Sequence, residues 1–260
     1  MTTVLKDVKK YGNSGGVYLP AEWVGGQVRV ELVRKPADPR KDLLALPLEH
    51  VVSIILYGSY VRGEMTEGSD IDVLIVTDGH KIDIPKLDGR YEINVRSASQ
   101  AKALAERDPI FYKAIKDESK ALFNHEFLED LRNVKPKASS AATRLELSES
   151  SLNIIKSFME LGSEPSDMAY PLMMRFKEIL FIECFFTNSK YTTGLLRKEI
   201  LAAGISRKDF QSLMSIYRAV RGGREAVEKV SADAITRLAG LLEKKISYVK
   251  NRYSKRLHRY

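Results

Sequence analysis

Residues 58–76 read GSYVRGEMTEGSDIDVLIV, and this stretch decides the fold of the chain around it. Its last part, from Ile71 to Val76, is apolar and rich in β-branched residues, as is VVSIILY at 51–57 just before it. Uninterrupted apolar runs of this length are typical of strands covered on both faces. Glycines stand at both ends of the segment between the runs. We therefore predict two buried strands separated by a polar connection that turns at Gly58 and Gly68.

The chain after this stretch alternates between strand and helix patterns. Tyr91 to Val95 is predicted to form a third strand after the turn at Asp88-Gly89. The segment SASQAKALAERD, which opens at Ser97, is predicted to be a helix that stops before Pro109, and a second helix follows to about residue 120. ALF at 121–123 reads as a short edge strand, and a short helix is expected to carry Arg62 in the polar connection.

Two flanking regions have different patterns. In the first 35 residues, VLKDVKKYG and GGQVRVELV alternate apolar and polar residues, which indicates two or three short strands. Residues 133–142 read as a linker, and four or five helices are predicted after it. The predicted fold class is an α+β core with a small mixed sheet, preceded by a β-hairpin module and followed by an all-α bundle. The expected domains are residues 1–36, 43–125 and 143–260.

Composition indicates a folded protein with an affinity for anions. The formal net charge is +8, hydrophobic residues make up 44% and charged residues 29% of the chain. The only cysteine, Cys184, lies in an apolar run and is interpreted as a core thiol, and no basic, apolar leader stands at the start. No run reaches the roughly 20 apolar residues that a membrane span needs. The expected location is the cytoplasm.

Carboxylates at alternate positions suggest a metal site. Side chains two residues apart on a strand point to the same face, so Asp70 and Asp72 are expected to bind the same pair of ions. Carboxylate oxygens are ligands that Mg²⁺ prefers, and phosphate oxygens often complete its shell. Glu92 is the candidate for a third carboxylate, as metal ligand or as base, with Asp83 as its rival. The alternative for Glu92 is a solvated strand face.

Small residues and an arginine upstream suggest a phosphate site. Gly58 lets a phosphate approach the backbone, and Ser59 offers a hydroxyl and an amide. The planar guanidinium of Arg62 suits phosphate oxygens. Ser69 either orients a carboxylate or caps a turn. The predicted nucleotide-binding residues are therefore Gly58, Ser59, Arg62 and Ser69.

GSYVRG followed by SDIDVLIV resembles the GSxxRG and SDxDLxV signature of the minimal nucleotidyltransferases of the polymerase-beta-like superfamily. The resemblance covers about residues 43–125. It implies that Gly58 and Ser59 bind a nucleoside triphosphate, that Asp70 and Asp72 hold Mg²⁺, and that Glu92 assists. Aspartate is commoner in that family at the position of Glu92.

VKKYGNSGGVYLPAEWVGGQVRVELV at 8–33 resembles the SpoVT/AbrB-like swapped-hairpin modules, which implies a homodimer and, in many such modules, DNA binding. Lys9, Lys10 and Arg29 either face phosphates or form a solvated surface. Trp23 is interpreted as a packing anchor.

The helical region is similar in plan to the bundles that accompany nucleotidyltransferase domains, including the HEPN-like class. The spacing of Arg252, His258 and Tyr260 matches the motif of that class formally. Residues six apart lie well away from each other around a helix, so we interpret this end as a basic tail. It either binds nucleic acid electrostatically or is a solvated helix end.

Together these patterns predict an enzyme that transfers a nucleoside monophosphate, AMP from ATP, to a hydroxyl acceptor with the help of Mg²⁺. The acceptor is left open between a protein, a small molecule and an RNA. The alternative is a DNA- or RNA-binding regulator that acts through the hairpin module and the basic tail.

Overall fold

The computed structural model describes residues 4, 6, 8–33, 37–65, 69–85, 87, 91–223 and 225–257.

A mixed sheet of four strands forms the first large element of the fold. The strands lie in the order β5-β4-β3-β6. Their bounds are β3 Val51–Tyr57, β4 Ile71–Thr77, β5 Tyr91–Ser97 and β6 Ser119–Phe123. Strand β3 is antiparallel to β4 and β6, whereas β4 and β5 are parallel. The predicted buried strands and the edge strand are confirmed.

Both faces of the sheet are covered, which explains the continuous apolar runs. On one face Ile55 and Leu74 pack with side chains of the helices α2 Ala98–Arg107, α3 Pro109–Asp117 and α4 His125–Arg132. On the other face Ile54 and Val73 pack with Leu43 of α1 Pro39–Leu44. Because side chains alternate along a strand, one run of β-branched residues supplies both cores.

Local capping sets the helix starts after β5. Ser97 accepts a hydrogen bond from the backbone of Gln100, and the Gln100 side chain accepts one from the Ser97 backbone, which is a capping box. Asp108 caps α3, whose first residue is Pro109. The predicted helix therefore ends before Pro109, as the sequence indicated.

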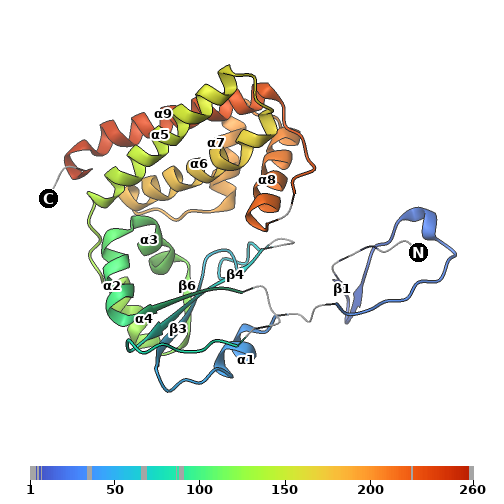
Figure 1. Cartoon of the computed structure of the whole chain (residues 1–260), viewed down its shortest axis with the longest axis vertical. Helices are drawn as coiled ribbons and strands as arrows, with labels where there is room; N and C mark the ends of the chain where they lie inside the picture. Colours follow the sequence, from blue (N-terminus) through green and yellow to red (C-terminus); the bar gives the residue numbers. More distant parts are fainter. Residues whose placement is uncertain are drawn as a thin grey trace.

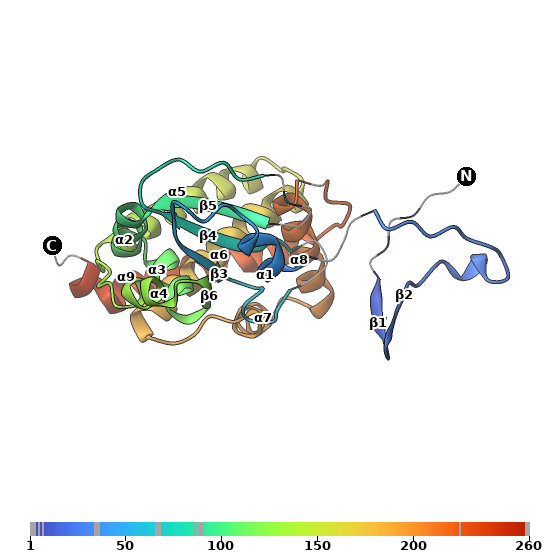
Figure 2. The ribbon, with the colours of Figure 1, turned by 90° about the horizontal axis from the view of Figure 1, so that it is seen from below.

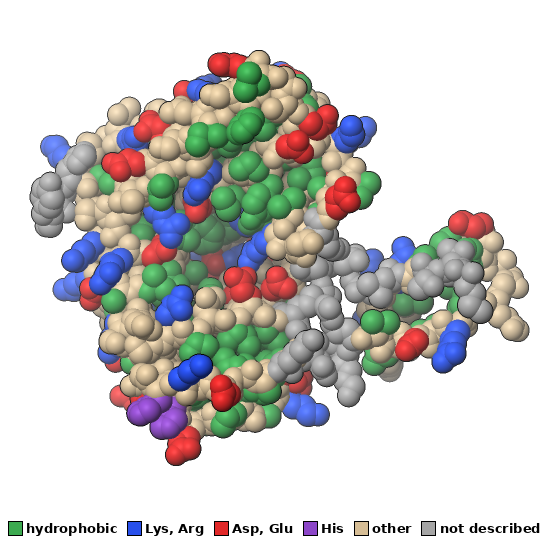
Figure 3. Space-filling model, viewed as in Figure 1, with side chains coloured by type: hydrophobic (Ala, Val, Ile, Leu, Met, Phe, Trp, Pro, Cys, Tyr) green, Lys and Arg blue, Asp and Glu red, His purple; other side chains and the backbone are tan. Residues whose placement is uncertain are grey.

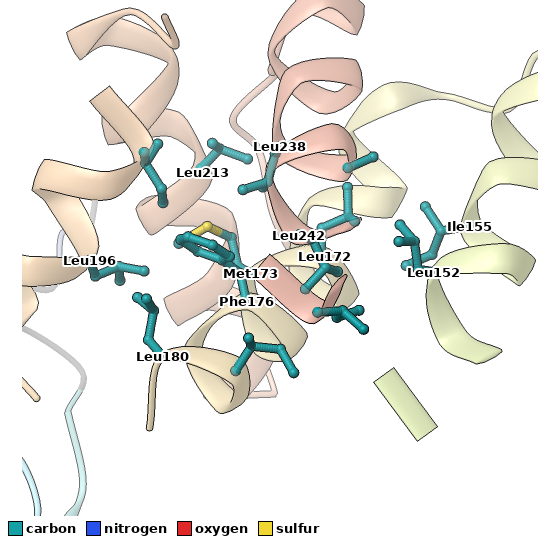
Figure 4. Packing of buried hydrophobic residues seen from close by; sticks show 14 of the residues in the cluster. Leu152, Ile155, Leu172, Met173, Phe176, Leu180, Leu196, Leu213, Leu238 and Leu242 are labelled. Atoms are coloured by element: carbon teal, nitrogen blue, oxygen red, sulfur yellow. The ribbon is translucent and has the colours of Figure 1, made fainter. Parts of the chain in front are cut away.

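Five helices form the C-terminal bundle: α5 Ser140–Glu160, α6 Pro165–Thr187, α7 Thr193–Ala202, α8 Arg207–Arg221 and α9 Ala232–Leu257. Helix α6 runs through the middle, and its Leu172, Met173 and Phe176 are fully buried against the surrounding helices (Figure 4). The described residues from 140 to 257 contain no strand. The prediction of an all-α region is confirmed, and the observed fold class is the predicted one. The exact domain boundaries remain a prediction.

The bundle packs directly onto the sheet part, residues 37–132. Figure 1 shows the bundle above the sheet, and Figure 2 shows the same arrangement from below. Helix α3 packs against α6, where the rings of Tyr112 and Phe185 meet edge to face with centroids 6.4 Å apart. One face of the bundle is therefore held beside the end of the sheet at which β3 stops.

The N-terminal segment confirms the predicted hairpin but not the position of its second strand. It forms a hairpin of β1 Lys9–Tyr11 and β2 Ser14–Gly16 and a short 3-10 helix, η1 Ala21–Trp23, that lie apart from the rest in Figure 1. The expected strand in GGQVRVELV is absent from the described residues 26–33. A strand needs a hydrogen-bonding neighbour, and residues 8–33 provide none for it. The resemblance to swapped-hairpin modules remains a prediction.

One smaller expectation changes, and another falls partly outside the described residues. Residues 58–63 form consecutive turns rather than the short helix predicted around Arg62. At the C-terminus, Arg252 lies over the rings of Tyr248 and Tyr253, whereas His258 and Tyr260 lie outside the described residues, as do Gly68, Asp88 and Gly89. The HEPN-like motif therefore remains a prediction. Among the described helices, none is both long and apolar enough to cross a membrane.

Candidate active site

Three adjacent strands bring three polar side chains into one row. Tyr57, the last residue of β3, lies opposite Asp72 of β4, and Asp72 lies opposite Glu92 of β5. Directly opposed residues on neighbouring strands share one face of a sheet. Asp72 is therefore the centre of the row, with a phenol on one side and a second carboxylate on the other.

The turn after β3 is shaped around Asp72. Gly58 has a φ of +75°, and a Cβ added there would collide with Oδ2 of Asp72. The backbone continues through two hydrogen bonds, from Arg62 N to Gly58 O at 3.2 Å and from Glu64 N to Ser59 O at 3.0 Å. The glycine is needed for its backbone conformation and for its lack of a side chain. The carboxylate and the turn backbone are consequently in close contact.

Burial dominates the electrostatics of Asp72. Its side chain is 15% exposed, and burial raises its pKa to about 6, with Glu92 and Asp70 raising it further and Arg221 opposing them. Desolvation disfavours the charged form of a carboxyl group unless a cation compensates. The site therefore favours the arrival of positive charge next to Asp72.

Tyr57 is a neutral member of the row. Burial raises its pKa to about 12, and the charges of Asp72 and Glu92 act in the same direction. Its hydroxyl accepts a hydrogen bond from Nδ2 of Asn94 at 3.3 Å. The phenol consequently keeps its proton at neutral pH and can donate it in a hydrogen bond. The sequence indicated Tyr57 only as a strand residue.

Arg221, at the end of α8, reaches the carboxylates from the bundle. Its Nη2 atom lies 3.4 Å from Oδ1 of Asp72 and 3.2 Å from Oε2 of Glu92. Arg221 stands in the basic segment YRAVRGGRE, for which the sequence leaves open both an acceptor wall facing the site and a core helix with a solvated face. Since Arg221 lies 149 residues from Asp72 in the chain, no local pattern connects the two. In Figure 3 the surface is hollowed between the sheet part and the bundle, and acidic and basic side chains gather there.

The predicted carboxylates are placed unequally. Glu92 stands beside Asp72, whereas Asp83, its rival, is exposed in the connection after β4. Asp70 precedes β4, is half-buried, and influences Asp72 through its charge. The three carboxylates do not form a compact cluster in the described part of the chain, because the ligand atoms of Asp70, Asp72 and Glu92 do not all lie within 4.8 Å of one another. Ser69 and Ser59 are half-buried beside this row.

Arg62 has a different environment from the one that the sequence suggested. Its guanidinium forms ion pairs with Glu118 and with Glu64, the latter at 2.8 Å, and lies 5.6 Å from the ring centroid of Tyr191. Glu64 also accepts a hydrogen bond from the hydroxyl of Thr193 at 2.9 Å. Arg62 and Glu64 thus join the turn at Gly58 to the residue between α3 and β6 and to the start of α7.

The donor set fits hard divalent cations. Asp70, Asp72 and Glu92 supply carboxylate oxygens only, and the raised pKa of Asp72 shows that its charge is incompletely compensated by Arg221. Mg²⁺ binds through one or two carboxylates and completes its shell with water and phosphate oxygens. Two ions about 4 Å apart can use ligands that are not all close together. The arrangement therefore fits a phosphate-transfer site.

Comparison with protein families identifies the domain that contains these residues. A model of the nucleotidyltransferase domain family matches residues 40–161, which include the whole sheet, the turn at Gly58 and the three carboxylates. No curated protein sequence matches the chain. Among solved structures, spectinomycin adenyltransferase from Enterococcus faecialis, crystallised with ATP and spectinomycin, aligns with 14% identity and a TM-score of 0.43, covering 77% of this chain and 93% of that one. The family match favours the enzyme over the alternative of a binding regulator. Residues 40–161 thus constitute a nucleotidyltransferase domain, which supports a nucleotidyltransferase enzyme.

Proposed function

We propose that the enzyme transfers AMP from ATP to a hydroxyl group of its acceptor, with Asp70 and Asp72 as ligands of Mg²⁺ and Glu92 as a third ligand or as the base. The observation that carries the proposal is the row of Tyr57, Asp72 and Glu92 beside the turn at Gly58. Bound Mg²⁺ would stabilise the charge that develops on the attacking and leaving oxygens. The acceptor is a small molecule, a protein side chain or an RNA end.

In the proposed reaction the acceptor oxygen forms a bond to the α-phosphorus of ATP, and the bond to the β-phosphate oxygen breaks. Pyrophosphate leaves, and the acceptor proton passes to a base. Glu92 is suited to that role because its side chain is 52% exposed, so that an acceptor can approach it. Ser59 offers its hydroxyl and backbone N–H to the triphosphate, whereas the N–H of Gly58 donates to the backbone oxygen of Glu118 at 3.0 Å. Arg221 provides a guanidinium next to the same carboxylates, where phosphate oxygens would arrive.

Transfer of labelled phosphate tests this function. The full chain is incubated with Mg²⁺, candidate acceptors and ATP labelled at either the α- or the γ-phosphate. We expect the α-label to move to the acceptor and the γ-label to leave in pyrophosphate. An Asp70→Asn/Asp72→Asn variant is the matched control and should transfer neither label. Transfer of the γ-label to the acceptor would show phosphoryl transfer and contradict the proposal.

The concentration of Mg²⁺ that gives half the maximal rate should depend on pH. A carboxyl ligand must lose its proton before it binds an ion, and the pKa of Asp72 is raised from 3.8 to about 6. We therefore expect this concentration to rise by up to about tenfold for each pH unit below that pKa, and to change little above it. Rate measurements at several Mg²⁺ concentrations across this range provide the check. A half-saturating concentration independent of pH would contradict the assignment.

The raised pKa of Asp72 also determines the direction in which the stability of the protein changes with pH. Because folding raises the pKa of Asp72, the folded state binds the proton more tightly than the unfolded state. Without a divalent cation, the contribution of this group to the free energy of unfolding therefore falls as the pH rises from 3.8 to about 6. Saturating Mg²⁺ should restore stability above that range.

Replacement of Arg62 separates its observed contacts from a role in nucleotide binding. An Arg62→Met variant leaves Glu118, whose side chain is 3% exposed, without its cation. Burial raises the pKa of Glu118 to about 7 even beside Arg62, so the unpaired acid can take up a proton. We therefore expect a lower melting temperature, most clearly above pH 7, where the carboxylate would stay charged without its partner. The Michaelis constant for ATP should stay unchanged. An Arg62→Lys variant keeps the charge, so its melting temperature should lie between those of the unmodified protein and of Arg62→Met. A raised Michaelis constant for ATP with an unchanged melting temperature would instead support binding of the triphosphate by Arg62.

A second proposal concerns the N-terminal segment: we propose that residues 8–33 associate with a second copy of the chain. Apolar side chains that would pack in a paired sheet are exposed here, with Val24 at 87%, Val30 at 70% and Val33 at 75%. Contiguous exposed apolar surface marks interaction sites. Light scattering should give a dimer for the full chain and a monomer for a chain that lacks residues 1–36. A monomeric full chain would contradict this association.

A further inference from the structure

Two of the four histidines of the chain converge on one aspartate, outside the site described above. His50 stands just before β3, whereas Asp78 and His80 follow β4. Nδ1 of His50 lies 3.0 Å from Oδ2 of Asp78, and Nδ1 of His80 lies 2.9 Å from Oδ1. The three ligand atoms all lie within 4.8 Å of one another, which among the described residues is true of no other group of three His, Cys, Asp or Glu side chains.

The backbone holds these three side chains together. Asp78 N donates to His50 O at 3.2 Å, which joins the beginning of β3 to the end of β4. His80 N donates to Oδ1 of Asp78 at 3.0 Å, and Gly79 between them has a φ of +116°. This backbone conformation favours glycine and turns His80 back toward Asp78. The cluster is therefore prearranged by the ends of two central strands.

The imidazole rings are also placed for a shared ligand. The rings of His50 and His80 stack with centroids 4.3 Å apart and an interplanar angle of 26°. Both present Nδ1 on the side of the carboxylate. A neutral imidazole can carry its single proton on Nε2, which leaves Nδ1 as an electron-pair donor. His50 is 38% and His80 69% exposed, so water can complete a coordination shell.

We propose that His50, Asp78 and His80 bind one divalent transition-metal ion of the zinc class. Two imidazole nitrogens and one carboxylate oxygen suit Zn²⁺, Co²⁺ or Cu²⁺, whereas Mg²⁺ prefers a shell of oxygens. The site is distinct from the nucleotidyl-transfer site, because Tyr57 and Asp72 lie at the other ends of the same two strands, about 20 Å away at six residue rises. In Figure 3 histidine side chains are visible at the edge of the sheet part, away from the hollow.

A metal here would act as a clamp on the sheet. It would connect His50, which precedes β3, to Asp78 and His80, which follow β4. These two strands form the centre of the sheet. A ligand that binds only the folded state raises its stability. The proposal is independent of the transfer reaction, which should continue in variants of this cluster.

Zinc binding to the full chain tests the proposal. Calorimetric titration is carried out with excess Mg²⁺, so that the carboxylates of the transfer site are occupied. We expect one Zn²⁺ per chain, and an affinity weakened about tenfold or more in His50→Gln and in His80→Gln. His125→Gln is the matched control, because His125 is 71% exposed on α4 and has a single carboxylate neighbour, Glu129, at 3.6 Å. Its affinity should equal that of the unmodified chain.

Two further measurements keep the outcome decisive. Zinc should raise the melting temperature of the unmodified chain and of His125→Gln but not of the His50→Gln/His80→Gln double variant. An Asp70→Asn/Asp72→Asn variant should bind zinc as tightly as the unmodified chain. The proposal is overturned if the unmodified chain binds no zinc, if the double histidine variant binds it equally well, or if binding is lost only in the aspartate variant.

Discussion

An Asp72→Asn variant should lose nucleotidyl transfer by about a thousandfold or more while it folds normally. The loss follows from the position of Asp72 between Tyr57 and Glu92, where it touches the turn at Gly58. Stabilisation of transition-state charge by bound cations contributes several kcal/mol, which corresponds to at least this change in rate. Steady-state rates at saturating ATP and Mg²⁺ provide the measurement.

The thermal stability of this variant should move in the other direction. Burial raises the pKa of Asp72, so the ionised carboxylate is unfavourable in the folded state without a metal. Asparagine has a similar shape and no charge to desolvate. We therefore expect a melting temperature equal to or above that of the unmodified protein in the absence of Mg²⁺. A much lower value would mean that the lost activity reflects unfolding.

Matched carboxylate variants make the assignment specific. Glu92→Gln should also reduce the rate, because Glu92 lies directly beside Asp72. Asp83→Asn should leave it unchanged, since Asp83 is exposed in the connection between β4 and β5. If Asp83→Asn were inactive and Glu92→Gln fully active, Asp83 would be the third carboxylate and the observed register would not describe the working site.

Gly58→Ala should reduce the rate by about a hundredfold or more, since displacement of reacting groups by about 1 Å can have an effect of this size. The substitution places a Cβ against Oδ2 of Asp72, so either the carboxylate or the turn must move. An alanine at a positive φ also costs about 1 to 2 kcal/mol in the folded state. Transfer rates and chemical denaturation measure the two effects separately.

Gly63→Ala is the control for that variant. Gly63 lies in the same turn and has a similar φ of +67°, but nothing lies within 4 Å of the Cβ that it would gain. Its free energy of unfolding should fall by the backbone cost alone, about 1 to 2 kcal/mol, and its activity should be nearly unchanged. Equal loss of activity in both variants would show that strain in the turn, not the contact with Asp72, is responsible.

The sheet was predictable because its signals are local. The apolar runs of β3 and β4 are continuous since both faces are covered, and Ser97 with Gln100 marks the start of α2 within four residues. Glu92 was also accessible to sequence reasoning, because parallel pairing of β4 and β5 places it beside Asp72. The apolar runs and the helix start each depend on a pattern shorter than a dozen residues, whereas Asp72 and Glu92 are joined by the pairing of two strands.

The remaining features depend on contacts that no local pattern encodes. Arg221 reaches the carboxylates only because the bundle packs against the sheet part, and Tyr57 joins the row only through the register of β3 with β4. The role of Arg62 in phosphate binding remains a prediction, and its contacts with Glu118 and Tyr191 come from distant segments. In GGQVRVELV the alternation is real, but the described chain offers no partner strand. Charge and periodicity alone could not distinguish these outcomes.

The contact of Arg221 with Asp72 and Glu92 limits how freely the two parts of this enzyme can be recombined. The carboxylates belong to the matched domain, whereas the guanidinium beside them belongs to α8, beyond residue 161. A domain transplanted without α8 would keep its buried acidic centre but lose the cation supplied by its neighbour. Any substitute bundle would have to present a positive side chain at the same position. Under the proposed function, the helical region is thus part of the catalytic unit and not an interchangeable attachment.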